Sequence, residues 1–160
     1  MIKVKRIDHV AIAVGDRDAS AGALAGLFGL DSGPREHVVS QKTDVAFLNA
    51  GADCDAALEI IAPAGNDGLS RFLDRRGPGL HHVCFEVDDL PGALASLKAA
   101  GVRLIDEAPR LGARGHQVAF LHPASTGGVL FELCSHSTTQ PSSQPASQPL
   151  SATPPHGAKA

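Results

Sequence analysis

The sequence is poor in aromatic residues and in excess positive charge. It contains no tryptophan, no tyrosine and only six phenylalanines. Proteins that bind single-stranded nucleic acid stack the bases on aromatic side chains, and nucleic-acid-binding domains in general present a basic surface. A net charge of −3 at pH 7 provides no such surface. We therefore expect no nucleic acid and no membrane among the partners of this chain.

Cysteines and long apolar runs are also scarce. The three cysteines, Cys54, Cys84 and Cys134, are odd in number and form no CxxC pair. This pattern is not that of a disulfide scaffold or a cysteine-zinc site. The first fourteen residues alternate like a strand and have too few apolar side chains for a signal peptide or a membrane span. We expect a cytoplasmic protein with reduced thiols.

The end of the chain lacks the side chains from which a core is built. Residues 136–160 consist mostly of Ser, Pro, Gln, Thr and Ala, with Leu150 as the single large apolar residue. Such a segment buries too little apolar surface to offset the entropy lost on ordering. We expect residues 136–160 to form a disordered tail and residues 1–135 to form one domain.

What the sequence does contain is an internal repeat. Three pairs of segments match at one offset of 73 residues: HVAIAVGD with HVCFEVDD (9–16 and 82–89), VAFL with VAFL (45–48 and 118–121), and LEII with FELC (58–61 and 131–134). Several separate matches at a constant offset indicate two copies of one supersecondary unit.

Each copy has the pattern of a strand, a helix and further strands. Apolar spacing, acidic N-caps and closing glycines predict one helix in each copy, and a third helix is predicted between the copies. We expect an α+β fold in which two pseudo-symmetric βαβββ modules, about 5–65 and 78–135, curl into one sheet around a cleft. A linking helix at about 66–77 joins them.

Strand alternation predicts which histidines face the cleft. Neighbours on a strand point to opposite faces. Val10 and Ile12 suit packing against a helix, which leaves His9 for the cleft. In the second copy, the same rule leaves His82 for the cleft and turns His81 away from it.

Two glutamates lie inside apolar strands with the same parity. Glu59 and Glu132 are related by the 73-residue offset, as His9 and His82 are. A carboxylate in such a run is costly to bury unless it is paired or bound to a cation, although either one alone could face solvent. A pseudo-twofold axis would gather all four side chains. Two imidazoles and two carboxylates suit Zn²⁺, Co²⁺, Ni²⁺, Mn²⁺ or Fe²⁺.

These segments resemble the vicinal oxygen chelate superfamily between residues 7 and 134. The stretches that carry the resemblance are IDHVAIAV, LEIIAP, GPGLHHVCFEVDD, GARGHQVAFLHP and GGVLFEL. The LHH and FLHP strings look like the methylmalonyl-CoA epimerase family in particular. The resemblance implies His9, Glu59, His82 and Glu132 as ligands of one divalent ion (Co²⁺, Zn²⁺, Mn²⁺ or Ni²⁺). It also implies a homodimer. Some members carry Gln at the position of Glu59, and ALAGLFG replaces the family's usual aromatic pair.

The resemblance further implies an acyl-CoA substrate. The expected reaction interconverts the (2R) and (2S) forms of methylmalonyl-CoA through a metal-stabilised enolate. Glu132 is expected to act as one base, and either Asp44 or Glu59 as the other. Substrate contacts are expected from His122, Arg114 and His116. Two alternatives are a glyoxalase I-like lyase acting on a glutathione hemithioacetal, and a metal-free small-molecule-binding module of the same fold.

Overall fold

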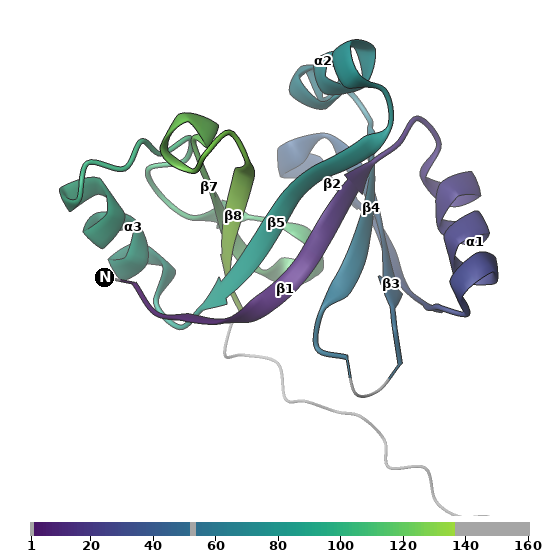
Figure 1. The fold of residues 1–160 in the computed structure, drawn as a ribbon, viewed down its shortest axis with the longest axis horizontal. Coiled ribbons are helices and arrows are strands. Elements are labelled where there is room, and N and C mark those ends of the chain that lie inside the picture. Colours follow the sequence, from purple (N-terminus) through teal and green to yellow (C-terminus); the bar gives the residue numbers. More distant parts are fainter. Residues whose placement is uncertain (1, 52–53, 137–160) are drawn as a thin grey trace, which may run out of the picture.

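Eight strands form one curved sheet in the computed structural model, which describes residues 2–51 and 54–136 (Figure 1). The strands are β1 (Val4–Ala13), β2 (Asp31–Val38), β3 (Thr43–Asn49), β4 (Ala57–Pro63), β5 (Gly79–Val87), β6 (Arg110–Leu111), β7 (Gln117–Leu121) and β8 (Leu130–Ser135). The helices are α1 (Arg17–Phe28), α2 (Asp67–Arg76) and α3 (Leu90–Ala99), with short 3-10 turns η1 (Val39–Gln41), η2 (Ala113–Gly115) and η3 (Pro123–Ser125).

The strand order confirms the two-module architecture that the repeat predicts. Along the sheet the order is β2-β3-β4-β1-β5-β8-β7-β6, so the second half mirrors the first. At the centre β1 runs antiparallel to β5, and each of them has a parallel partner, β4 and β8 respectively. A pseudo-twofold axis therefore passes between β1 and β5, with β4 and β8 on either side of this central pair.

Side-chain caps set the ends of the helices. The side chains of Asp16 and Asp89 accept hydrogen bonds from the third residue beyond them and so begin α1 and α3. Asn66 caps α2 in the same way. Gly29 ends α1 in the left-handed region, with φ of 65°. Phe28, the last residue of α1, is 64% exposed.

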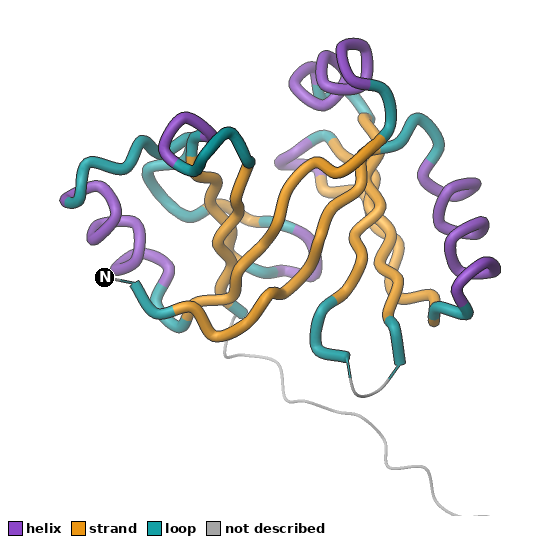
Figure 2. Tube along the Cα trace, viewed as in Figure 1, coloured by secondary structure: helices purple, strands orange, loops and turns teal. Residues whose placement is uncertain are grey.

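On the convex side of the sheet, α1 and α3 each pack against a cluster of buried apolar side chains. The core between α1 and the sheet contains Val14, Ala21, Ala46, Leu48, Ile60 and Ala62, and the core between α3 and the sheet contains Val87, Leu90, Ala93, Leu94, Ala119, Leu121 and Leu133. In Figure 2, α1 and α3 lie on opposite flanks of the sheet, with α2 between them near the top. The alternation expected for the first strand is confirmed, because Ile12 and Val14 contact the core under α1.

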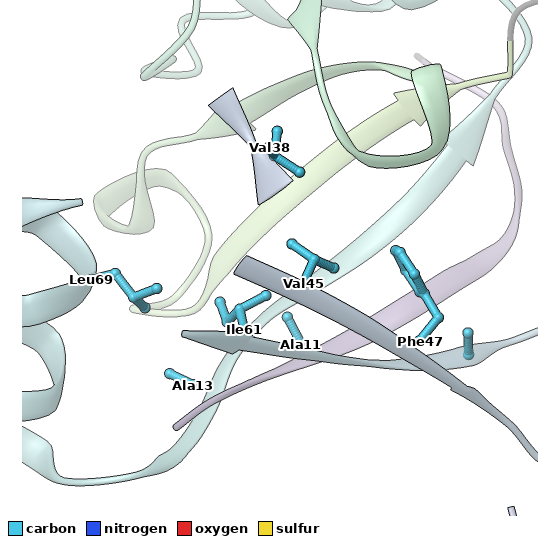
Figure 3. Packing of buried hydrophobic residues seen from close by; sticks show 8 residues of the cluster. Ala11, Ala13, Val38, Val45, Phe47, Ile61 and Leu69 are labelled. Atoms are coloured by element: carbon cyan, nitrogen blue, oxygen red, sulfur yellow. The ribbon is translucent and has the colours of Figure 1, made fainter. Parts of the chain in front are cut away.

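A third core covers the other face of the first module. It contains Ala11, Ala13, Val38, Val45, Phe47, Ala57, Ile61 and Leu69 (Figure 3). Phe72 and Leu73 of α2 pack against it. Since Ala11 and Ala13 have small side chains, this face of β1 leaves room for larger groups beside it.

Among the helices of the described residues, none is long and apolar enough to cross a membrane. The predicted tail lies outside the described residues except for His136, whose imidazole contacts Asp8.

Candidate metal centre and active site

The four predicted ligand residues meet at the centre of the sheet. His9 and His82 come from β1 and β5, and Glu59 and Glu132 come from the parallel neighbours β4 and β8. All four side chains are buried, with residue exposures between 4% and 6%. The topology brings them together because β1 of the first module pairs with β5 of the second, which joins the two modules edge to edge in one sheet.

The donor atoms of these residues converge on one point. The Nε2 atoms of His9 and His82 are 3.3 Å apart. Glu59 Oε2 lies 3.3 Å from His9 Nε2 and 3.6 Å from His82 Nε2. Glu132 Oε2 lies 3.0 Å from His82 Nε2. Nitrogen and carboxylate donors aimed at one point fit a divalent ion of the first transition series.

Each histidine has its other ring nitrogen engaged by the residue before it in the chain. Asp8 Oδ1 lies 2.8 Å from His9 Nδ1, and His81 Nδ1 lies 2.9 Å from His82 Nδ1. Such partners fix the tautomer of a ligating imidazole and turn its free nitrogen toward the metal. The two copies therefore place the partner of the ligand histidine in the same position, but the partner is a carboxylate in the first copy and an imidazole in the second.

Irregularities in the pairing of β1 and β5 explain why these partners face inward. The register shifts between Ile7 and His9, and again between Ala11 and Ile12, where the chain passes from His82 to Leu80 and skips His81. A bulge of this kind breaks strict alternation. The expectation that His81 points away from the cleft is therefore wrong, since His81 lines the cavity described below.

Asp8 is a functional candidate that sequence reasoning missed. It is 2% exposed and accepts hydrogen bonds from four groups. Besides His9, these are Arg6 at 3.2 Å, Arg114 at 2.7 Å and His136 at 2.9 Å. Strict alternation would put Asp8 on the same face of β1 as Val10 and Ile12, opposite His9. The only feature of the sequence that could have indicated a role for Asp8 is its position directly before the predicted ligand His9.

The electrostatic field of the cluster favours a cation. Burial alone would lower the pKa of His9, but Glu59 and the hydrogen bond to Asp8 raise it to about 10. Burial raises the pKa of Glu59, but the neighbouring His9, His82 and Arg114 together outweigh this effect, so the net shift is downward. In the metal-free protein a proton on His9 thus offsets part of the negative charge of the surrounding carboxylates. A divalent ion would take the place of that proton.

A cavity of about 610 Å³ opens beside the cluster. Glu59 and His82 reach it from the sheet, and Phe120 forms part of its wall. The rings of Phe47 and Phe120, related by the repeat, lie edge to face with His9 and His82. The remaining lining comes from η1 and its C-cap, the start of α2, Thr43, Ile61, Gly65, His81, Ile105, Arg110 and Leu130.

Arg114 and His116 close the opposite side of the cluster. The guanidinium of Arg114 lies 4.0 Å from the centre of the Phe47 ring and bonds to Asp8. The His116 ring stacks on His136 at 4.0 Å, and burial lowers the pKa of His116 to about 4. Both line a small hollow of about 10 Å³ behind the ligands, and neither lines the large cavity. The structure does not bring these two predicted substrate contacts to the open side.

Two other predicted residues also lie away from the cluster. Asp44 shares a face of β3 with Ala46 and Leu48, which pack under α1, and its carboxylate bonds to His37 at 2.8 Å. The structure therefore does not bring Asp44, predicted as a base, to the cluster. His122 accepts a hydrogen bond from the backbone of Ala124 and caps η3. His122, predicted to contact substrate, is not among the residues that line the cavity.

Comparison with known proteins places this chain in a family. The profile of the Glyoxalase/Bleomycin resistance protein/Dioxygenase superfamily matches residues 8–120. The chain is 35% identical over 130 residues to the mitochondrial methylmalonyl-CoA epimerase of Bos taurus, covering 80% of this chain and 73% of the relative. It is 34% identical over 133 residues to an ethylmalonyl-CoA/methylmalonyl-CoA epimerase of Cereibacter sphaeroides, covering 81% and 97%.

The chain belongs to the methylmalonyl-CoA epimerase family of this superfamily. A solved structure of a variant of the Streptomyces coelicolor methylmalonyl-CoA epimerase, in complex with 2-nitronate-propionyl-CoA, has the same fold. It superposes with a TM-score of 0.80 at 30% identity, covering 85% of this chain and 97% of that one. The fold predicted from the repeat and the family that the sequence segments resemble are confirmed, and members of this epimerase family are isomerases.

For this member of the epimerase family, Asp8→Asn is expected to weaken divalent metal binding about 10- to 100-fold. The variant replaces the carboxylate that orients His9 with a group of similar shape and no charge. Titration of the apo protein with Co²⁺ or Zn²⁺ measures the effect. Asp74→Asn, on the exposed face of α2, is the matched control and should bind like the wild type. An unchanged dissociation constant for Asp8→Asn would show that Asp8 does not support the ligand.

Proposed function

We propose that this protein is a metal-dependent epimerase that interconverts the (2R) and (2S) forms of methylmalonyl-CoA. The observation that carries the proposal is the pair of buried carboxylates, Glu59 and Glu132, that flank two facing imidazoles in a chain of the epimerase family. Epimerisation needs a proton to leave one face of a carbon atom and another to arrive at the opposite face. Two carboxylates from two modules suit that requirement.

The cavity supports an acyl-CoA substrate. Its volume of about 610 Å³ lies in the range of sites for drug-sized molecules and leaves room for an acyl group and part of a pantetheine arm. Relatives named for methylmalonyl-CoA and ethylmalonyl-CoA are 34–35% identical in sequence to this chain. An additional methylene typically changes preference about 10- to 200-fold, so we expect ethylmalonyl-CoA to be a slower substrate.

His9, His82 and Glu132 would hold the metal, with Glu59 beside them. Their donor atoms lie within 4.8 Å of one another, apart from those of Glu59, which contacts both histidines. We propose Co²⁺, Zn²⁺, Mn²⁺ or Ni²⁺. When bound, the ion supplies Lewis-acid stabilisation of the negative charge that develops on the substrate's oxygen atoms.

Glu132 and Glu59 would move the proton. One ionised carboxylate accepts the C2 proton, which leaves a planar enolate, and the other, which enters the step as a carboxylic acid, delivers its proton to the opposite face, so the two groups exchange protonation states. Each positioned base typically contributes about 10²–10⁴-fold. Glu59 is the second base in this proposal because Asp44 lies on the face of β3 that packs under α1. Phe47 and Phe120 exclude water beside the two histidines.

Proton NMR of methylmalonyl-CoA in D₂O tests the function directly. We expect the purified, metal-loaded protein to remove the C2 proton signal and to interconvert the epimers in a stereospecific coupled assay. Treatment with a chelator should abolish both effects, and added metal should restore them. Loss of the signal that persists in fully metal-depleted protein would contradict metal dependence. No exchange with metal-loaded protein would refute the epimerase, and turnover of a glutathione hemithioacetal would then identify a lyase.

A further inference from the structure

Lys42 has a backbone conformation that side chains other than glycine's rarely adopt. Its φ is 50° and its ψ is 48°, in the left-handed region. Among the described residues other than glycine, only Lys42 and Arg114 have a positive φ. In this region the Cβ atom crowds the backbone carbonyl, so the conformation carries a steric cost for lysine.

The internal repeat shows that glycine is an alternative at this position. Gly115, at the same 73-residue offset, is the last residue of η2, whereas Lys42 directly follows η1, and the φ of Gly115 is 71°. One copy of the unit therefore meets the backbone requirement with glycine, and the other retains a long cationic side chain. A strained residue where glycine would serve suggests a role for the side chain itself.

The surroundings of Lys42 hold its backbone and direct its side chain. Its amide donates to Val39 O at 3.2 Å, and its carbonyl accepts from Ala64 N at 2.9 Å. The stem of the side chain lies along Gly65, where an added Cβ would lie 3.7 Å from Cδ of Lys42. The residue lines the same cavity as Glu59 and His82.

The ammonium group of Lys42 is available to a ligand. Lys42 and Arg110 are the lysine and arginine side chains that line the cavity within the described part of the chain. Arg110 bonds to Asp106 at 3.1 Å and lies over the ring of Phe120. Within residues 2–51 and 54–136, no carboxylate lies within ion-pair distance of Lys42.

We propose that Lys42 binds a phosphate group of the acyl-CoA tail, an inference that rests on the proposed function. The reacting carboxylate and thioester belong beside Glu59 and His82, deep in the cavity. Lys42 is exposed at the rim, where a long tail leaves the protein. An ammonium group on a positioned stem forms charge-assisted hydrogen bonds with phosphate oxygens.

Calorimetric titration with CoA and with pantetheine, which lacks all the phosphates, tests this assignment. Lys42→Gly and Lys42→Met are expected to bind CoA about 3- to 10-fold more weakly than the wild type and to bind pantetheine equally well. Lys42→Arg keeps the charge and should bind CoA within about twofold of the wild type. Lys3→Met, an exposed lysine that does not line the cavity, is the charge-matched control.

Thermal unfolding separates the role of the charge from that of the conformation. Lys42→Gly removes both the ammonium and the strain, whereas Lys42→Met removes only the ammonium. We expect Lys42→Gly to unfold about 2–4 °C above Lys42→Met although both bind CoA poorly. A lower midpoint for Lys42→Gly would refute the view that lysine is retained here against its backbone preference.

The remaining outcomes each decide one question. Unchanged CoA binding by Lys42→Gly in an enzyme that epimerises methylmalonyl-CoA would refute the role of Lys42 and leave the proposed function standing. Equal weakening of CoA and pantetheine would also refute it, because the partner would not be a phosphate. Wild-type protein that binds CoA through Lys42 but performs no epimerisation would support the phosphate contact and refute the proposed reaction.

Discussion

Glu132→Gln is expected to lower epimerisation about 10²–10⁴-fold and to leave the C2 proton of one epimer exchangeable. The substitution keeps the shape of the side chain and removes a carboxylate that lies 3.0 Å from His82 Nε2. Glu59 remains on the other side of the paired imidazoles. A one-base enzyme can remove and return a proton on one face of the carbon atom, but it cannot invert the centre.

Separate incubation of the (2R) and (2S) substrates in D₂O measures this effect. Glu132→Gln should exchange the proton of one epimer, and Glu59→Gln that of the other. Metal content is measured in parallel, because both residues lie at the candidate metal centre. Asp44→Asn is the matched control, since its carboxylate pairs with His37 away from the cluster, and it should keep the wild-type rate within about twofold. Full turnover by a metal-loaded Glu132→Gln variant would rule Glu132 out as a base.

Divalent metal affinity is expected to rise about 100-fold between pH 6 and pH 8. The pKa of His9 in the metal-free protein is about 10, mainly because Glu59 and Asp8 outweigh the effect of burial. His9 is therefore protonated throughout this range, and a metal must displace that proton. Each unit of pH toward acid then costs about tenfold in affinity. A histidine with its ordinary pKa near 6.5 would lose this dependence above about pH 7.5.

Calorimetry in buffers with different ionisation enthalpies counts the protons that the metal displaces. At pH 8 we expect about one proton to be released per metal bound. Asp8→Asn removes one cause of the raised pKa of His9, so its affinity should level off at a lower pH than that of the wild type. An affinity that does not change above pH 7.5 in the wild type would contradict the raised pKa of His9.

The residues of the central cluster could be predicted from the sequence because two patterns in the chain correspond directly to positions in the folded structure. Side chains alternate along a strand, and equal offsets in a repeat become symmetry about an axis. Together they selected His9, Glu59, His82 and Glu132, which the fold brings together. The helices were also predictable, since their caps and apolar faces are local features of the chain.

Asp44 shows where a local pattern is insufficient. Its parity with Ala46 and Leu48 was visible in the sequence, but which face of β3 meets α1 was not. Only the packing of the helix on the sheet decided that this row faces away from the cavity. His122 was similarly ambiguous, because a strand-end histidine can meet a ligand or cap a turn, and here it caps η3.

The sequence by itself determined the repeat, the parity of the ligand residues, the net charge and the scarcity of aromatic residues. The tertiary structure decided what surrounds the ligands. Register shifts between β1 and β5 turn Asp8 and His81 inward, and no local signal marks such a shift. The rim of the cavity depends on how η1 and α2 pack beside the cleft, which places Lys42 at its mouth. Contacts between distant segments arise only once the chain has folded, so a pattern read along the chain does not contain them.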